Sequence, residues 1–243
     1  MRLLDLKEQF WHMKRIRIGN WRKQGFEFLL IFIAVISAFA LNNWNENRKT
    51  EDSENKILTA IANGLEKDID DIRSNKRGHK KGISACVYFR KLLTNQEVNP
   101  DSLLVQYENL TRTFISIQNV AGYETLKSQG LGLVSDDSLR LQIISLYEYD
   151  FNALRKLEEE YSELQFQKNY FNEINTVLAP NFEFDENGKP SGIALPLEIS
   201  ENQKKILLVY LSKIEENRNF ILTFYSDIET KIESVRKNIT KEI

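Results

Sequence analysis

The chain has 243 residues, a formal net charge of −2, 10 glycines, 4 prolines and one cysteine. The near-neutral charge provides no field that would attract nucleic acid, so no nucleic-acid partner is expected. One cysteine excludes an intramolecular disulfide framework, and two histidines on opposite sides of an apolar run argue against a zinc site. Because turns depend on glycine and proline, their scarcity predicts an all-α fold of long helices.

Residues 1–25 are predicted to form a basic amphipathic cytoplasmic tail. Leu3, Leu6, Phe10 and Met13 recur every three or four positions, which is the spacing of an apolar helical stripe, and cations surround them. Such a helix can lie on the inner leaflet of a membrane. An equally good interpretation is a basic tail that only sets the orientation of the segment after it.

Residues 26–45 are predicted to form a transmembrane helix, so the lipid bilayer is an expected partner. The stretch from Phe28 to Leu41 carries no charge. At ~1.5 Å per residue, Phe26 to Trp44 covers roughly 28 Å, close to the hydrocarbon thickness of a bilayer. The residues expected at the two membrane interfaces are Trp21, Glu27, Asn42, Asn43 and Trp44.

The charges before the apolar run predict its orientation. Residues 1–25 contain seven lysines and arginines against two carboxylates, Asp5 and Glu8. The positive-inside rule therefore places the N-terminus in the cytoplasm and residues 46–243 in the periplasm, with a single pass through the inner (plasma) membrane. Two alternatives stay open. Ala38-Phe39-Ala40 matches a signal-peptidase pattern, which would cleave the span after Ala40, and so short an apolar run also fits a buried helix of a soluble protein.

Residues 46–243 are predicted to form an elongated antiparallel helical bundle. Apolar residues recur at helical spacing over 57–72 and again over 83–93, and Gly78 and Gly82 between them are expected to bend this helix. The outer faces are too polar to enter lipid. Each helix must therefore bury its apolar stripe on a neighbour.

Further helices are expected after this one. Asp101 is a candidate N-cap for a short helix. Residues 150–178 and 200–239 carry apolar side chains at the heptad spacing typical of coiled coils, and "SENQ" at 200–203 is a candidate capping box. Residues 180–196 contain proline and glycine and are expected to be a loop, so the two heptad-patterned helices should form a hairpin.

Arg218 interrupts the apolar stripe of the last helix. In a hairpin that turns at 180–196, it comes to lie beside the glutamates at 159–163 of the opposite helix. A charge in a helix interface needs a partner. The sequence therefore predicts a buried charge pair between Arg218 and Glu163.

Two stretches resemble a known family. Glu27 and "NNWNE" at 42–46 stand at the two ends of the apolar run, and "YETLKSQGLGLVSDDSLRLQIISLY" occupies 123–147. Together they are similar to a family of uncharacterised single-span bacterial membrane proteins, common in Gram-negative species. That family combines a glutamate, a span closing in N-N-W-N-E and a Y-x-x-L-K-x-x-G segment. The resemblance covers about 26–46 and 118–147 and implies location and architecture but no activity.

The second of these stretches holds a corner between two predicted helices. Its residues are Tyr123, Lys127, Gly130 and Arg140. Gly130 suits a left-handed helix end, and Ser135 or Asp136 can cap the next helix. The corner is either a structural turn or a recognition site for a partner.

Catalytic, cofactor-binding and metal-binding motifs do not occur in the sequence, and we expect no enzyme and no cofactor. Asp68, Asp70 and Asp71 lack the spacing of a calcium loop and are expected on a solvated helix face. The sequence favours a membrane-anchored scaffold or partner-binding protein, whose partner is another protein or a second copy. The alternative is a periplasmic small-molecule sensor that signals through a membrane partner, with a pocket lined by Tyr123, Tyr147 and Tyr149.

Overall fold

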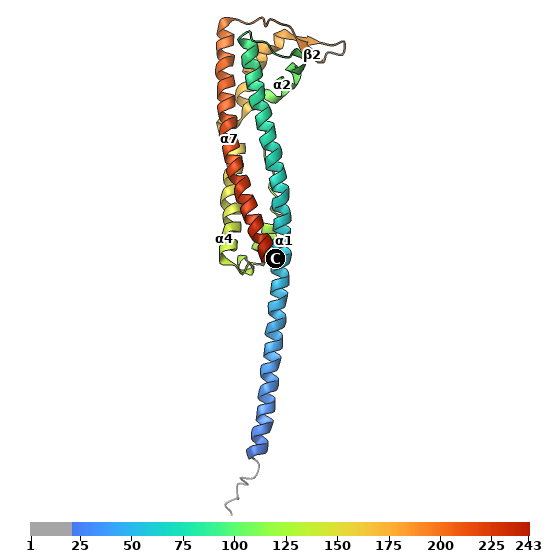
Figure 1. Ribbon diagram of the computed structural model, residues 1–243, viewed down its shortest axis with the longest axis vertical. Helices are drawn as coiled ribbons and strands as arrows, with labels where there is room; N and C mark the ends of the chain where they lie inside the picture. Colours follow the sequence, from blue (N-terminus) through green and yellow to red (C-terminus); the bar gives the residue numbers. More distant parts are fainter. Residues whose placement is uncertain (1–20) are drawn as a thin grey trace, which may run out of the picture. The chain divides into compact units, whose positions relative to one another are not determined.

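The computed structural model describes residues 21–243, and most of the predicted basic tail lies outside the described residues. The helices are α1 (Trp21–Leu93), α2 (Leu103–Leu110), α3 (Ala121–Gln129), α4 (Asp137–Ile144), α5 (Phe151–Glu159), α6 (Asn172–Leu178) and α7 (Glu201–Glu242), shown in Figure 1. Short 3₁₀ or π turns are η2 (Pro100–Ser102), η3 (Leu131–Leu133), η4 (Ser145–Asp150), η5 (Ser162–Leu164), η6 (Gln167–Phe171) and η7 (Ala179–Asn181). The strands β1 (Phe182–Phe184) and β2 (Pro190–Ile193) are brief, so the predicted all-α class is confirmed.

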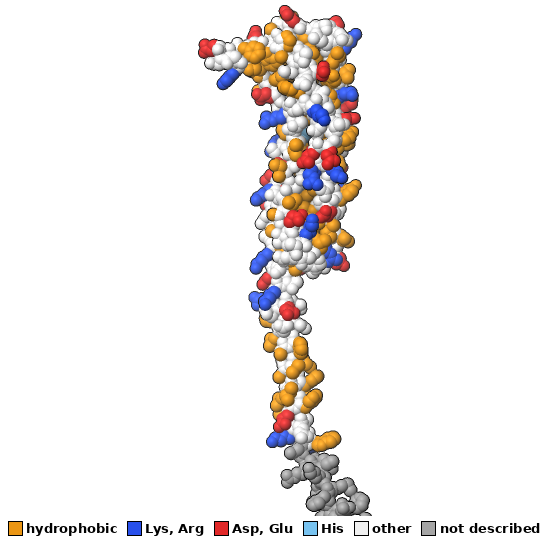
Figure 2. All heavy atoms as spheres, turned by 180° about the vertical axis from the view of Figure 1, so that it is seen from behind, with side chains coloured by type: hydrophobic (Ala, Val, Ile, Leu, Met, Phe, Trp, Pro, Cys, Tyr) orange, Lys and Arg blue, Asp and Glu red, His pale blue; other side chains and the backbone are white. Residues whose placement is uncertain are grey.

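The chain divides into two units, Met1–Asp52 and Ser53–Ile243. In the first unit, the described residues form the N-terminal part of α1, which contains a stretch long and apolar enough to cross a membrane. All five predicted interface residues are helical and exposed. Figure 2 shows the hydrophobic side chains along this stretch. Where the stretch ends, the Asn42 side chain donates a hydrogen bond to Glu46 at 3.0 Å.

The second unit contains two long helical segments that run antiparallel. Residues with higher numbers in α1 contact residues with lower numbers in α7. Glu66 pairs with Arg236 at 3.2 Å, whereas Arg90, farther along α1, pairs with Glu215. The arm from α4 to α6 is also antiparallel to α7. Its Gln142 accepts a hydrogen bond from Asn238 at 2.8 Å, and Glu163 accepts one from Asn217 at 3.0 Å. The predicted antiparallel arrangement of these arms is therefore observed within the second unit.

Helix α7 follows its predicted pattern along its whole length. Ser200 and Gln203 form the predicted capping box, which satisfies free N–H groups at the helix start. The buried residues of α7 are Leu207, Leu211, Ile214, Arg218, Ile221, Tyr225, Ile228, Ile232, Val235 and Ile239. These are the heptad positions of the sequence. One register therefore holds from Leu207 to Ile239.

The arm opposite α7 differs from its prediction. The expected continuous helix over 150–178 stops after Glu159 and resumes as a π turn and α6. Side-chain amides replace the missing backbone bonds, since Gln165 donates to the Glu158 carbonyl at 2.7 Å and Asn169 donates to that of Ser162. The expected loop at 180–196 contains the antiparallel hairpin of β1 and β2.

The predicted N-cap of the short helix also differs. Asn99, not Asp101, caps the chain here, because its side-chain oxygen accepts a hydrogen bond from the Asp101 N–H at 3.0 Å. The 3₁₀ turn η2 comes first, and α2 follows it without a capping side chain.

Candidate functional site

An extended chain segment replaces a helix in the second unit. Residues 112–120 have no regular secondary structure. Phe114 lies beside Gly78 of α1, and Gly122 lies beside Ile61. The segment therefore runs antiparallel to α1, and it advances few residues while α1 covers several turns, as an extended chain does. The run "TFISIQNV" is rich in β-branched side chains, which suit this conformation.

Carboxylates on two helices accept the amide hydrogens of this segment. Asp68 of α1 binds the Asn119 N–H at 2.8 Å, and Asp71 binds the Ile117 N–H at 3.0 Å. Glu158 of α5 accepts from the Ser116 N–H at 3.1 Å. Unpaired backbone groups in an interior are costly, and here side chains take the place of a neighbouring strand.

Arg218 of α7 binds carbonyl groups at the end of α2 and at the start of the segment. One guanidinium nitrogen donates to Leu110 at 3.0 Å, to Arg112 at 2.9 Å and to Asn109 at 3.3 Å. The guanidinium also lies 4.3 Å from the centre of the Phe166 ring. We call Asp68, Asp71, Glu158 and Arg218 the clamp. Its members come from three helices, and all but the half-buried Asp71 are buried.

The predicted charge pair of Arg218 with Glu163 is not formed, which corrects the sequence prediction. Within residues 21–243, Arg218 has no carboxylate partner, and the exposed Glu163 offers only its backbone carbonyl, to Asn217. The predicted register between α7 and the opposite arm was therefore nearly correct, because Asn217, the neighbour of Arg218, does contact Glu163. The partner differs because the carbonyl groups of Asn109 and Leu110, at the end of α2, and that of Arg112 reach Arg218 from another side.

His79 lies next to Arg218 and is neutral. Its Nδ1 is 3.3 Å from an Arg218 nitrogen, and because a guanidinium only donates, Nδ1 must accept. Burial, with the charge of Arg218, lowers the pKa of His79 to about 3. Burial raises the pKa of Glu158 to about 7 and lowers that of Arg218 to about 10. Burial thus opposes the charge on His79, Glu158 and Arg218.

Two glycines of α1 make room for the clamped segment. A Cβ on Gly78 would overlap the Phe114 ring, and a Cβ on Gly82 would overlap the Arg218 guanidinium. The expected bend at these glycines is absent, because α1 stays helical to Leu93. The two glycines allow Phe114 and Arg218 to lie close to the α1 backbone, and they do not bend the helix.

Gly78→Ala is expected to lower the free energy of unfolding of the second unit by about 1–3 kcal/mol, because the added methyl must displace Phe114. Gly25→Ala is the matched control in the same helix, since a Cβ there meets nothing within 4 Å. Denaturant titration of the full chain in detergent, followed by circular dichroism at 222 nm, measures both. Equal stability of the two variants would contradict this close contact.

The clamped segment presents three apolar side chains outward. Ile117 is 75% exposed, Ile115 49% and Val120 47%. Phe114 and Ser116 point the other way, as expected for alternation along an extended chain. We call Ile115, Ile117 and Val120 the ridge. Sequence reasoning missed it because the clamp residues Asp68 and Asp71 were expected on a solvated face.

The polar groups of the predicted corner bind one another. Tyr123 is buried and donates to Glu148 at 2.9 Å. Lys127 forms ion pairs with Glu124 at 3.2 Å and Glu148 at 3.3 Å, and its amine lies 5.4 Å from the centre of the Tyr123 ring. These contacts favour the structural interpretation of the corner.

Arg140 and Gly130 shape the same corner. Arg140 donates to the Val134 carbonyl at 2.9 Å and pairs with Asp137 at 2.5 Å. Gly130 ends α3 with a φ of 103°, which glycine adopts without strain. Asp136 is the cap of α4, accepting from the Leu139 N–H at 2.9 Å.

Two of the three tyrosines that the sensor hypothesis places around a pocket pack against each other. The Tyr123 and Tyr147 rings stack at 4.4 Å with an interplanar angle of 8°, and both are buried. Tyr149 is exposed. The stacked rings of Tyr123 and Tyr147 leave no space between them for a ligand.

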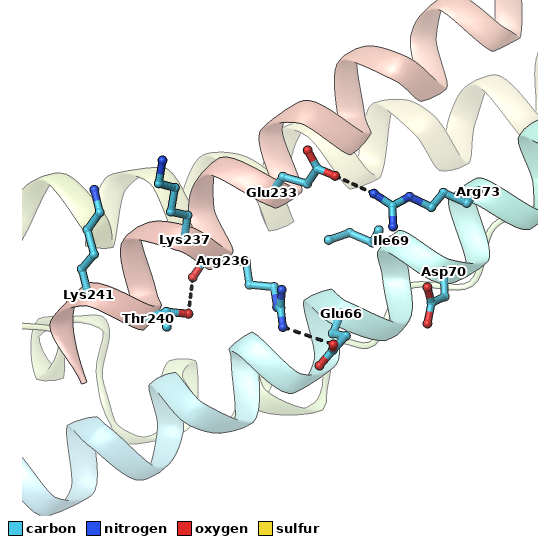
Figure 3. A pocket seen from close by; sticks show the side chains of 9 residues that line it. All are labelled: Glu66, Ile69, Asp70, Arg73, Glu233, Arg236, Lys237, Thr240 and Lys241. Carbon is cyan, nitrogen blue, oxygen red and sulfur yellow. Dashed lines mark hydrogen bonds and ion pairs between the residues drawn. The ribbon is translucent and has the colours of Figure 1, made fainter.

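A charged groove of about 530 Å³ lies between α1 and α7 (Figure 3). Arg73 binds Glu233 at 2.7 Å and Arg236 binds Glu66 at 3.2 Å, so its opposite charges meet across the groove. These pairs join the two helices at the surface. Exposed ion pairs of this kind contribute little stability.

Comparison with protein-family models, with curated proteins and with solved structures finds no match to this chain. The family resemblance of its sequence stays a prediction.

Proposed function

We propose that this chain is a membrane-anchored, non-enzymatic partner-binding protein whose helical unit lies in the periplasm and binds another protein through the ridge. The observation that carries the proposal is the ridge itself: an apolar edge held in a fixed conformation by the half-buried Asp71 and the buried Arg218.

The apolar stretch of α1 supports the anchor. Large apolar side chains from Phe26 to Trp44 are about half exposed or more. Soluble monomers rarely expose a contiguous apolar surface of this extent, whereas a lipid bilayer covers it. The cations before the stretch support a cytoplasmic N-terminus.

The clamp supports a role for the segment beyond filling space. A fourth helix would satisfy its own backbone, while an extended segment needs partners from its neighbours. Burying charged side chains for this purpose carries a desolvation cost of several kcal/mol per ion before compensation. What the arrangement provides is a rigid edge with Ile115 and Ile117 facing outward. Exposed, preorganised apolar side chains bind partners at low entropic cost.

The proposal is tested with a photo-crosslinking amino acid at Ile117 in the full chain. Val209 of α7, which is 54% exposed, is the matched control outside the ridge. Irradiation of spheroplasts should give a defined crosslinked band at Ile117 and not at Val209. Protease added outside should remove that band, because the second unit is proposed to lie outside the cytoplasm.

The same band at both positions, or at neither, would contradict binding at the ridge. A crosslinked band that resists external protease would contradict the orientation instead. The two parts of the proposal therefore fail separately.

A further inference from the structure

The sequence contains two Asn-Gly pairs, and the structure places them in different backbone environments. Asn63-Gly64 lies within α1, whereas Asn187-Gly188 lies in the turn between β1 and β2. Both asparagine side chains are exposed. In both pairs the following residue is a glycine, whose nitrogen has no neighbouring Cβ to shield it from the asparagine side chain. A difference in reactivity between the two asparagines therefore reports on their backbones.

Asp185 holds the turn between β1 and β2. Its Oδ1 accepts hydrogen bonds from the Asn187 N–H at 2.9 Å and the Lys189 N–H at 2.8 Å, and its carbonyl oxygen accepts one from the Gly188 N–H at 3.0 Å. Gly188 has a φ of 74°, which glycine adopts without strain.

The hairpin that carries this turn is small and exposed. Residues 183–190 are all exposed, and the two strands with their turn stand out from the long helices of the second unit in Figure 1. The strands contain only three and four residues. A two-stranded hairpin has little stability of its own. The turn therefore opens at a lower free-energy cost than the interior of a packed helix.

We propose that Asn187 is a site of spontaneous deamidation in the folded protein, and that the backbone of α1 protects Asn63 from the same reaction. This inference concerns the β1–β2 turn and rests neither on the ridge nor on the membrane anchor.

The reaction begins when the Gly188 N–H leaves the Asp185 carbonyl. The Gly188 nitrogen loses its proton and attacks the side-chain carbonyl carbon of Asn187. A new carbon–nitrogen bond forms, the bond to the side-chain amide nitrogen breaks, and ammonia departs with the proton, which leaves a cyclic imide. Water then adds to either carbonyl of the ring and opens it, giving aspartate or isoaspartate.

The helix opposes this reaction at Asn63. Gly64 is an interior residue of α1, so its N–H is bound within the helix. Helical side chains lean toward the N-terminus of the helix, which turns the Asn63 side chain away from the Gly64 nitrogen. Gly64 also packs closely on the clamped segment, because a Cβ there would lie 3.3 Å from the Asn119 Cβ. Ring closure at Asn63 therefore requires α1 to unwind where it is packed.

Mass spectrometry of the full chain in detergent micelles tests the proposal. The chain is incubated at pH 8 in water enriched in heavy oxygen, which marks each side chain hydrolysed during the incubation, and is then digested. The Asn187 peptide is expected to convert about tenfold faster than the Asn63 peptide, or more, because opening the turn costs less than unwinding α1. In guanidinium chloride the two rates should become nearly equal, since neither backbone is then ordered.

Equal rates in the folded chain, or a faster rate at Asn63, would overturn the proposal. An Asn187 peptide that stays unmodified for as long as the denatured chain needs to convert would also overturn it, because the turn would then protect the site.

Asp185→Ala tests the role of the turn itself. The variant removes the side-chain acceptor of the Asn187 and Lys189 N–H groups and leaves α1 unchanged. The rate at Asn187 should rise severalfold while the rate at Asn63 stays constant. A rate at Asn187 that does not rise would contradict opening of this turn as the step that admits the reaction.

Discussion

Replacement of Arg218 by methionine is expected to lower the free energy of unfolding of the second unit by about 2–5 kcal/mol. The guanidinium donates to three carbonyl groups, and each buried acceptor left unpaired costs ~1–3 kcal/mol. Removing the charge offsets part of this loss, because burial already disfavours the charged form and lowers the pKa of Arg218 to about 10. Three unpaired acceptors cost roughly 6 kcal/mol at the middle of that range, and the relief is roughly 3 kcal/mol, which leaves a net loss of about 3 kcal/mol. The lost hydrogen bonds outweigh it.

Arg90→Met provides the matched control for this prediction. Arg90 also joins α1 to α7, through an ion pair with Glu215, but its side chain is 36% exposed. Exposed pairs contribute less than about 1 kcal/mol. Arg218→Lys separates charge from geometry, since one ammonium group cannot reproduce the planar fork of donors. Denaturant titration of the full chain at pH 8 measures all three. Full stability of Arg218→Lys would show that only the charge matters.

The long helices could be predicted from the sequence because their packing is local and periodic. In α7 every core position repeats at heptad spacing, so one register identifies Leu207 and Ile239 alike. The capping box at Ser200 likewise involves only four adjacent residues, so the sequence alone identifies it. Such features depend on neighbours within two turns of the same helix.

The clamp could not be predicted in this way, because its partners are far apart in sequence. Arg218 was recognised as a charge on an apolar stripe, yet its partners are backbone carbonyls about one hundred residues earlier. A backbone group has no residue-specific signature. The one local signal was the β-branched run at 113–120, whose alternation differs from the helical period around it.

Gly78 and Gly82 show a second limit of sequence reasoning. Two glycines in a helical pattern predict a bend in the helix. Here they instead lie against the side chains of Phe114 and Arg218. The distinction depends on what lies opposite the helix. It therefore requires the position of Phe114 and Arg218 in space.

The stability of the natural chain is expected to vary little between pH 4.5 and pH 6.5 at the clamp, because Glu158 and His79 act in opposite directions. Glu158 has a raised pKa, so the folded state holds a proton that the unfolded state has lost. His79 has a lowered pKa, so the folded state lacks a proton that the unfolded state has gained. The numbers of bound protons are equal in this window, and the linkage slope is near zero.

Single substitutions should reveal the two slopes. In Glu158→Gln only His79 remains, and stability should rise by about 2.3 kcal/mol from pH 4.5 to pH 6.5. In His79→Gln only Glu158 remains, and stability should fall by about the same amount over this range. Burial also raises the pKa of Asp68, but its contribution is shared by all three proteins. Parallel pH profiles from denaturant titrations of the three full chains would show that neither group carries the shifted pKa inferred from its burial, and opposite slopes would show that the clamp encloses both groups in their neutral forms.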